Sequence, residues 1–235
     1  MIIYGKNTVK EAILANRVVH IVYIDNKFND KAILNLIAEK NIKMTKTNKH
    51  ELNLLTDNGL HQGVVAKVKN YETSVLDILF DGKKKNIVIL DKIVDPHNFG
   101  AIIRTAEAAG IDALIVSSRG QVKVTPTVTK IASGALEYLP IIEVNNLNNA
   151  ILKLKENNFI IIGAALEGKE NFNLVNDEFS KALIIGNEGV GISYLLKKNS
   201  DYLVKIPMKG KTNSLNASVA AGLLIYEMMG LFKKE

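Results

Sequence analysis

The chain has 235 residues, of which 47% are apolar, and it contains no cysteine and only four histidines. Disulfide bridges and thiolate metal sites are therefore excluded, and no histidine pair has the spacing of a zinc-binding motif. No apolar run reaches the ~18 residues that a membrane span needs, and no basic segment precedes the first apolar residues, so we expect a cytoplasmic protein without a signal peptide or a membrane partner.

The net charge is +6, and the positive charge is densest near the N-terminus. Residues 1–70 contain 11 lysines and arginines against 6 acidic residues, whereas residues 71–82 contain three acidic residues and no basic one. A polyanion such as RNA would bind the first segment by releasing counterions. Lysines that are merely solvated would give the same count, so charge alone leaves both interpretations open.

Residues 1–70 are predicted to form a small α/β domain. Five short segments alternate between helical and strand-like spacing of apolar residues: 9–16, 20–25, 31–41, 42–46 and 63–71. Residues 71–84 then become acidic and end in a glycine and a lysine run, which is typical of a linker between domains.

From residue 85 to residue 235, strands and helices alternate. Six runs rich in Val and Ile are of the kind that is buried on both faces of a parallel sheet: 86–91, 113–117, 140–144, 159–166, 181–186 and 202–207. Helices are expected between them, including one over 128–139 and a last one over 216–232. We predict an open α/β sheet covered by helices, which binds its ligands at the carboxyl ends of the strands.

The first polar loop follows the strand at 86–91. Asn98 is predicted to cap a helix that ends near Gly110. Small residues flank Arg104 four positions away on either side, which would leave its guanidinium open to a bulky partner. A surface ion pair with Glu107, three residues further on, explains Arg104 equally well.

The second loop, GNEGVG at 186–191, lies between a predicted strand and a helix. Its glycines would let backbone amides approach a ligand closely, but their order excludes the dinucleotide-binding fingerprint. Glu188 would repel a phosphate, which favours a neutral or cationic ligand. A purely structural turn is the alternative.

The third loop contains the sequence GKT at 210–212, which resembles part of a phosphate-binding loop. The glycine that such a loop requires five residues earlier is replaced by Lys205, so the spacing of a phosphate-binding loop is not met and a nucleotide hydrolase is disfavoured. Ser214 and Asn216 follow and enter a helix of small residues. They either cap that helix or hold a polar ligand.

Taken together, the three loops resemble the motifs of the SpoU family of RNA ribose methyltransferases, within the SPOUT superfamily. The matching segments are DPHNFGAIIRTAEAAG, LIIGNEGVGI and IPMKGKTNSLNASVAAGLLIYE, and the resemblance covers 85–235. YGKNTVKEAI and HQGVVAKV in residues 1–70 resemble the small ribosomal-protein-like RNA-binding domain of the family, with Thr8 where a small apolar residue is usual. The pairing is similar to the RlmB type, which methylates a guanosine of 23S rRNA.

This resemblance implies a SPOUT-type open parallel sheet with a C-terminal trefoil knot, and a homodimer whose sites use both subunits. It implies S-adenosylmethionine as the cofactor, held by main-chain groups of Gly186, Ile206 and Leu215. The expected partner is RNA, not DNA. A guanosine of tRNA is an alternative substrate, and a non-catalytic RNA-binding protein that retains the fold is an alternative function.

The resemblance also implies that Arg104 activates the ribose 2′-hydroxyl. Because arginine stays protonated in proteins, we expect it to bind the adjacent phosphate and to stabilise the developing alkoxide, not to act as a base. Asn98, Ser214 and Asn216 would orient the ribose and Arg104. Glu188 would either lie near the positively charged methyl donor or anchor the first loop.

Overall fold

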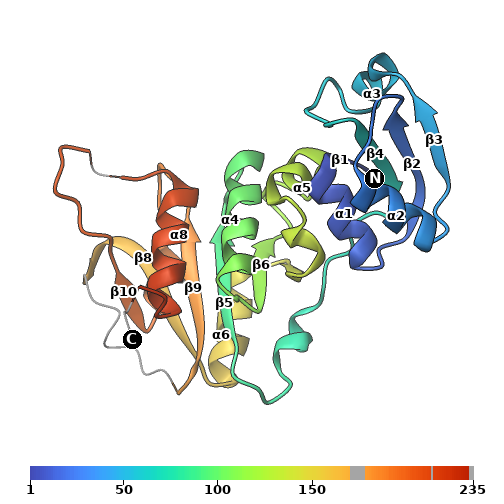
Figure 1. Ribbon diagram of the computed structural model, residues 1–235. Helices are drawn as coiled ribbons and strands as arrows, with labels where there is room; N and C mark the ends of the chain where they lie inside the picture. Colours follow the sequence, from blue (N-terminus) through green and yellow to red (C-terminus); the bar gives the residue numbers. More distant parts are fainter. Residues whose placement is uncertain (170–177, 213, 233–235) are drawn as a thin grey trace. The chain divides into compact units, whose positions relative to one another are not determined.

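The computed structural model describes residues 1–169, 178–212 and 214–232 and contains two compact units. Unit 1 comprises Met1–Glu72 and Val124–Tyr138, and unit 2 comprises Thr73–Lys123 and Leu139–Glu235 (Figure 1). Within the described residues, no helix is long and apolar enough to span a membrane.

Unit 1 is built on a mixed sheet of four strands in the order β1-β4-β2-β3. The strands are β1 (Ile2–Tyr4), β2 (Val19–Asp25), β3 (Met44–Thr47) and β4 (Val64–Val68). β4 pairs antiparallel with β1 and β2, whereas β2 and β3 are parallel. The α/β character predicted for this part of the chain is confirmed.

Helices cover both faces of this sheet because both faces carry apolar side chains. α1 (Lys6–Leu14) and α2 (Lys31–Glu39) bury Ile13 and Ile33 against one face. α3 (Lys49–Leu55) buries Leu52 against the other face, beside Tyr4 and Val65.

The segment Val124–Tyr138 completes unit 1 although it lies between two strands of unit 2 in the sequence. It contains α5 (Pro126–Ala132) and the 3-10 turn η2 (Ala135–Glu137). The prediction of one helix over 128–139 is wrong, because the backbone is left-handed at Ser133 (φ 53°) and Gly134 (φ 101°). A Cβ atom at Gly134 would collide with the Glu11 side chain of α1, so glycine permits the close approach of the segment to that helix.

Unit 2 contains a parallel sheet of six strands in the order β10-β8-β9-β5-β6-β7. The strands are β5 (Asn86–Asp91), β6 (Ala113–Ser117), β7 (Ile141–Val144), β8 (Phe159–Lys169), β9 (Ser180–Gly186) and β10 (Tyr202–Val204). All five pairings are parallel, which confirms the predicted open sheet. The trefoil knot implied by the resemblance stays a prediction.

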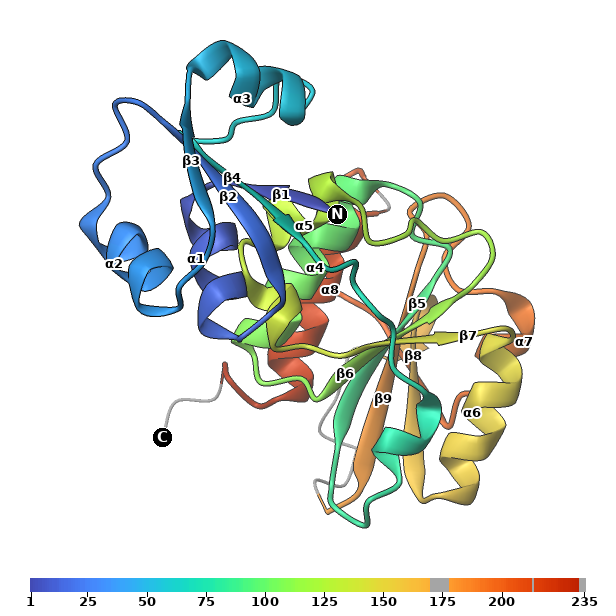
Figure 2. The same cartoon turned by 90° about the vertical axis from the view of Figure 1, so that its right-hand side faces the viewer.

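Figure 2 shows helices on both faces of this sheet. α4 (Pro96–Ala108) and α8 (Ala217–Met228) pack side by side on one face. α6 (Leu147–Glu156) and α7 (Tyr194–Asn199) cover the other, and the short η1 (Leu76–Leu79) lies near β7. α8 ends earlier than predicted, with Met229 as its C-cap.

The three polar loops all follow the carboxyl ends of parallel strands, and these ends lie along the same side of the sheet. β5 and β9 are neighbours, with Asp91 opposite Gly186 at their carboxyl ends. Because the strands are parallel, the loops that leave β5, β9 and β10 all start from this side, where open α/β sheets bind their ligands.

Candidate active site

The loop after β5 turns into α4 with Asp95 as its N-cap, because the Asp95 carboxylate accepts a hydrogen bond from the His97 backbone N–H at 3.0 Å. The predicted capping by Asn98 is therefore wrong. Asn98 lies in the first turn of α4 and is only 8% exposed. Since it does not cap its own helix, its side-chain amide can contact another loop.

That contact is made with Glu188 of the glycine-rich loop. The Glu188 Oε1 atom accepts hydrogen bonds from Asn98 Nδ2 at 3.0 Å, from Asn216 Nδ2 at 2.8 Å and from the Ala217 backbone N–H at 3.0 Å. Asn216 Nδ2 also donates to Asn98 Oδ1 at 2.9 Å. One carboxylate oxygen thus joins all three polar loops, a geometry that agrees with the anchoring alternative for Glu188. The placement of Glu188 near a methyl donor stays a prediction.

Asn216 has two structural roles in this cluster. Its Oδ1 atom caps α8 by accepting from the Ser218 N–H at 2.9 Å and the Ser218 hydroxyl at 2.6 Å, while its Nδ2 atom donates to Asn98 and Glu188. Glu188 therefore lies at the positive end of the α8 helix dipole, where a negative charge is stabilised. The capping role expected for Asn216 as an alternative is confirmed, and it coexists with the polar cluster.

The glycine-rich loop folds tightly back on itself. A Cβ atom at Gly186 would collide with the backbone of Gly191 and Ile192, and Gly191 has a left-handed φ of 69°. Within the loop, the Asn187 side chain accepts from the Gly189 N–H at 2.8 Å. Gly186 and Gly191 are thus required by the turn itself, and the same loop also forms one wall of a cavity.

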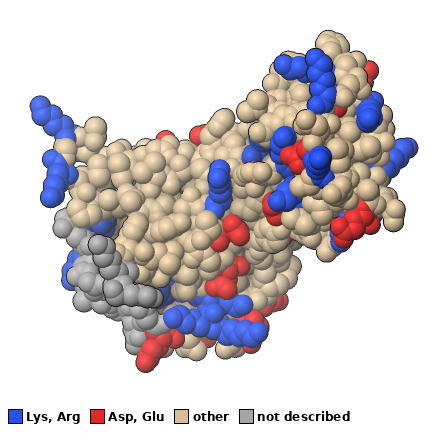
Figure 3. All heavy atoms as spheres, viewed as in Figure 1, with Lys and Arg blue, Asp and Glu red and all other residues tan. Residues whose placement is uncertain are grey.

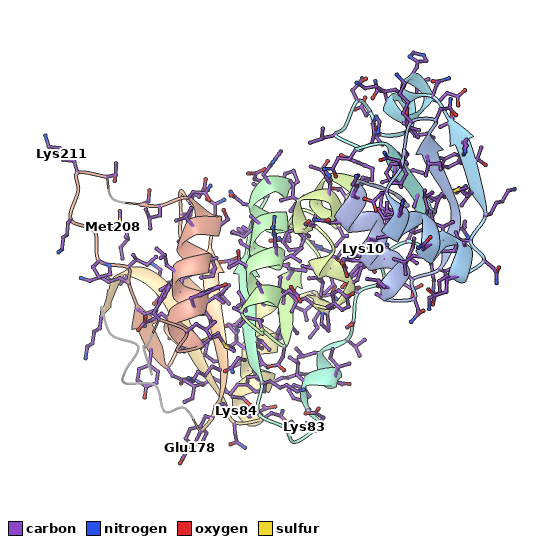
Figure 4. The ribbon with its side chains drawn as sticks, in the orientation of Figure 1. Lys10, Lys83, Lys84, Glu178, Met208 and Lys211 are labelled. Atoms are coloured by element: carbon purple, nitrogen blue, oxygen red, sulfur yellow. The ribbon has the colours of Figure 1, made fainter. Side chains whose placement is uncertain are left out.

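The cavity has a volume of about 210 Å³ and lies between the second and third loops. All three residues expected to hold a cofactor, Gly186, Ile206 and Leu215, line it, and so do Glu188 and Ser214. Most of the remaining walls are apolar: Ala164, Ala165, Leu166, Ile185, Val190, Ile192, Val204, Ala217, Ala220 and Leu224. Figure 4 labels Met208, which also lines the cavity, and Lys211 on the segment between β10 and α8.

Of the residues expected to act in catalysis, two lie outside the hydrogen-bonded cluster. Ser214 is exposed at the cavity and makes no hydrogen bond with the described part of the chain. Arg104 is exposed on α4, and among the described residues it forms neither a hydrogen bond nor the ion pair with Glu107 that was considered from the sequence. The guanidinium of Arg104 is therefore available to an external ligand.

Sequence reasoning overlooked two residues that support the loops. Asp91 ends β5, is 5% exposed, and accepts a hydrogen bond from the Ser193 N–H at 2.7 Å. Asn187 donates to the Lys92 carbonyl at 3.3 Å. A carboxylate directly after the apolar run 87–90 was the available signal for Asp91. No group of His, Asp or Glu side chains in the described ranges could hold a metal ion.

Comparison with known proteins shows that both parts of the chain match family models. Residues 85–226 match the SpoU rRNA Methylase family, and residues 2–74 match the domain described as RNA 2′-O ribose methyltransferase substrate binding. The putative TrmH family tRNA/rRNA methyltransferase of Staphylococcus epidermidis is 38% identical, over 97% of this chain and 94% of the relative. The putative TrmH family tRNA/rRNA methyltransferase YacO of Bacillus subtilis is 37% identical, over 96% and 94%.

Solved structures show the same fold. The SpoU methyltransferase AviRb from Streptomyces viridochromogenes has a TM-score of 0.83 and 25% identity, over 98% of this chain and 88% of AviRb. An AdoMet-bound rRNA methyltransferase from Sinorhizobium meliloti has a TM-score of 0.84 and 21% identity, over 99% and 88%.

Proposed function

Because the chain belongs to the SpoU rRNA methylase family, we propose that it transfers a methyl group from S-adenosylmethionine to a ribose 2′-hydroxyl of RNA, with a guanosine of 23S rRNA as the substrate. The observation that carries this proposal is the meeting of three loops at one carboxylate oxygen of Glu188, beside a cavity at the carboxyl edge of a parallel sheet.

The residues around the cavity suit this cofactor chemically. Ile185, Val204 and Leu224 provide apolar walls for a purine ring, and Glu188 provides a carboxylate that would attract a sulfonium cation. Main-chain groups of Gly186, Ile206 and Leu215 would hold the cofactor. The volume of about 210 Å³ is below the roughly 300–1,000 Å³ of typical small-molecule sites, so part of the cofactor would extend beyond the cavity.

When bound, S-adenosylmethionine supplies an electrophilic methyl group on a sulfonium centre. We expect the protonated guanidinium of Arg104 to bind the phosphate next to the target ribose and to stabilise negative charge on the attacking oxygen. Asn98 and Asn216 act as positioning residues, since both are bonded to Glu188 and thereby hold the first and third loops together. Ser214, exposed at the cavity, would orient the ribose.

A homodimer belongs to this proposal. Figure 3 shows few charged side chains on the surface over α8. Val219 and Leu223 on that helix are 51% and 39% exposed, and a second copy of the chain would remove them from water. Residues 1–70 would bind the RNA substrate, 71–84 would link the domains, and 85–235 would catalyse the transfer, in line with the two family matches.

The test has two steps. Calorimetry with S-adenosylmethionine should give a binding isotherm, and its absence would favour a non-catalytic RNA-binding protein that retains the fold. Total RNA from a strain that lacks the gene should then accept labelled methyl groups from the purified protein. Mapping the label to 23S rRNA would support the proposed substrate, whereas label in tRNA would favour the alternative guanosine substrate.

A further inference from the structure

Unit 1 contains a second cavity that the methyl-transfer site does not use. Its volume is about 660 Å³, within the range of small-molecule sites. Three connections of the unit contribute to its walls: the β1–α1 turn, the β2–α2 loop, and α3 with the loop to β4. The lining residues are Lys6, Asp25, Lys27, Phe28, Asn29, Lys49, Asn53, Asn58, Gly59, Leu60, His61, Gln62 and Gly63.

The charge of this cavity favours an anion. Three lysines line it against one aspartate. Lys6 is already paired with Asp30, at 3.1 Å. Lys27 and Lys49 are exposed, and neither forms an ion pair with any described residue. Two ammonium groups are therefore available to a phosphate.

An aromatic ring forms another part of the wall. Phe28 is half-buried, and the Lys6 ammonium lies 5.5 Å from its ring centroid. The backbone of Gly63 passes so close that a Cβ atom there would lie 3.0 Å from Phe28 Cδ2. The ring is thus fixed in place in a cavity that lysines also line. Proteins that bind single-stranded nucleic acid combine basic grooves with aromatic rings on which bases stack.

The third wall is a rigid turn with polar groups. His61 is 5% exposed, its Nδ1 atom accepts from the Gly63 N–H at 3.0 Å, and its Nε2 atom lies 3.0 Å from Asn53 Oδ1, so the ring is neutral with its proton on Nε2. Gln62 has a left-handed φ of 56°, which is strained for a residue with a side chain.

The Gln62 side chain is oriented by two donors. Its Oε1 atom accepts from the Lys6 backbone N–H and from Lys130 Nζ, each at 3.1 Å. Its amide nitrogen makes no hydrogen bond within the described ranges. A fixed amide donor of this kind suits the edge of a base.

We propose that this cavity binds one unpaired nucleotide of the RNA substrate, with the base against Phe28 and the phosphate bound by Lys27 and Lys49. The inference rests on the proposed function and adds to it a place where the substrate is recognised away from the reacting ribose. A base inside a duplex is stacked and cannot enter such a cavity, so the ligand is a loop, a bulge or a single strand.

The experiment measures RNA binding by the full chain without cofactor. The probes are a short fluorescein-labelled single-stranded RNA and the duplex that it forms with its complement. Lys27→Gln combined with Lys49→Gln should weaken single-strand binding about tenfold, and should lower the slope of log Kd against log salt by roughly 0.7 for each phosphate that the protein no longer neutralises. Lys43→Gln combined with Lys46→Gln removes the same charge from exposed positions outside the cavity and is the matched control.

A second pair of variants isolates the ring. Phe28→Leu should weaken single-strand binding at least fivefold, whereas Phe28→Tyr, which keeps an aromatic ring, should bind like the unmodified chain. Equal losses in the cavity and control lysine variants, equal affinity of all Phe28 variants, or equal affinity for the duplex would each overturn the inference.

Calorimetry with S-adenosylmethionine on the same proteins separates this inference from the proposed function. If the unmodified chain binds no cofactor, the proposed function fails and the RNA-binding result still stands. If the cofactor binds and methyl transfer proceeds while the cavity variants match their control, the inference alone fails.

Discussion

Asn98 Nδ2 lies 3.0 Å from Glu188 Oε1, although the two residues are 90 positions apart in the chain. The same oxygen also accepts a hydrogen bond from Asn216 Nδ2, so the loops after β5 and β9 and the start of α8 share one acceptor. Glu188 and Asn216 are both exposed, so water competes for these hydrogen bonds and each contributes less than a buried bond to a charged group would. Together they hold the three loops in one arrangement.

The first prediction concerns Glu188. Glu188→Ala leaves the two amides and the Ala217 N–H without their common acceptor, and we expect it to lower the free energy of unfolding by about 1–2 kcal/mol and to weaken S-adenosylmethionine binding. Glu188→Gln keeps an oxygen acceptor, so its stability and its affinity for S-adenosylmethionine should fall less than those of Glu188→Ala. Thermal unfolding and calorimetry measure both effects, with Glu143→Ala at an exposed position of β7 as the control. Unchanged cofactor affinity in Glu188→Ala would contradict the anchoring role.

The second prediction concerns Arg104. Arg104→Ala should abolish methyl transfer while cofactor affinity stays within a few-fold, because the exposed guanidinium has no partner among the described residues to lose. The free energy of unfolding should stay within about 0.5 kcal/mol. Arg104→Lys should also lack methyl transfer if the reaction needs a planar, bidentate contact between the side chain and the phosphate. Glu107→Ala is the control and should retain activity. Loss of cofactor binding in Arg104→Ala would make the residue structural.

The third prediction compares two glycines. A Cβ atom at Gly186 would collide with the backbone of Gly191 and Ile192, so Gly186→Ala should destabilise the chain by about 1–3 kcal/mol and disrupt the cavity wall. A Cβ atom at Gly210 would meet nothing within 4 Å, and Gly210→Ala should be tolerated. Chemical denaturation and cofactor titration of the two variants test this contrast. Equal stability would show that the loop relaxes without cost.

The fourth prediction concerns the segment that completes unit 1. Arg17 Nη1 lies 2.7 Å from Glu137 Oε1, and the two side chains are only 9% and 7% exposed. Removing one partner of a buried pair costs about 3–5 kcal/mol, so Arg17→Met should be strongly destabilising. Arg17→Met combined with Glu137→Leu should recover most of the loss. Denaturation curves of the single and double variants measure the coupling, and purely additive losses would refute it.

The fifth prediction concerns pH. Burial, together with the positive charges of Lys49 and Lys130, holds the pKa of His61 below its ordinary value of 6.5, although Asp25 acts in the opposite direction. Below pH 6.5 the unfolded chain therefore binds a proton that the folded chain does not, and the free energy of unfolding should fall as the pH decreases from 6.5 to the lower folded-state pKa.

The measurement is a series of melting temperatures across this pH range. His61→Asn removes the titrating group, so its melting temperature should change less steeply with pH. His50→Asn is the control, because His50 is an exposed histidine in the same unit and its removal should leave the slope intact. An identical slope in the unmodified chain and in His61→Asn would assign the pH dependence to other groups.

The strands of unit 2 were predictable from the sequence for a simple physical reason. A strand that is buried on both faces needs a continuous apolar run, and such runs mark β5, β6 and β9 almost to the residue. The mismatch at Lys205 likewise excluded a triphosphate loop without any coordinates. In contrast, β1 and α3 in unit 1, with three and seven residues, are too short for apolar periodicity to reveal them.

The tertiary structure alone decided which polar residues meet. Asn98 was expected to cap its own helix, but Asp95 does so, which leaves the Asn98 amide for Glu188. The segment Val124–Tyr138 joined unit 1 because Ser133 and Gly134 break its helix and bring it against α1. Local sequence determines helix and strand propensity and the apolar pattern of each segment, since both depend on near neighbours along the chain. A hydrogen bond between residues 90 positions apart leaves no local pattern, so only the folded chain establishes it.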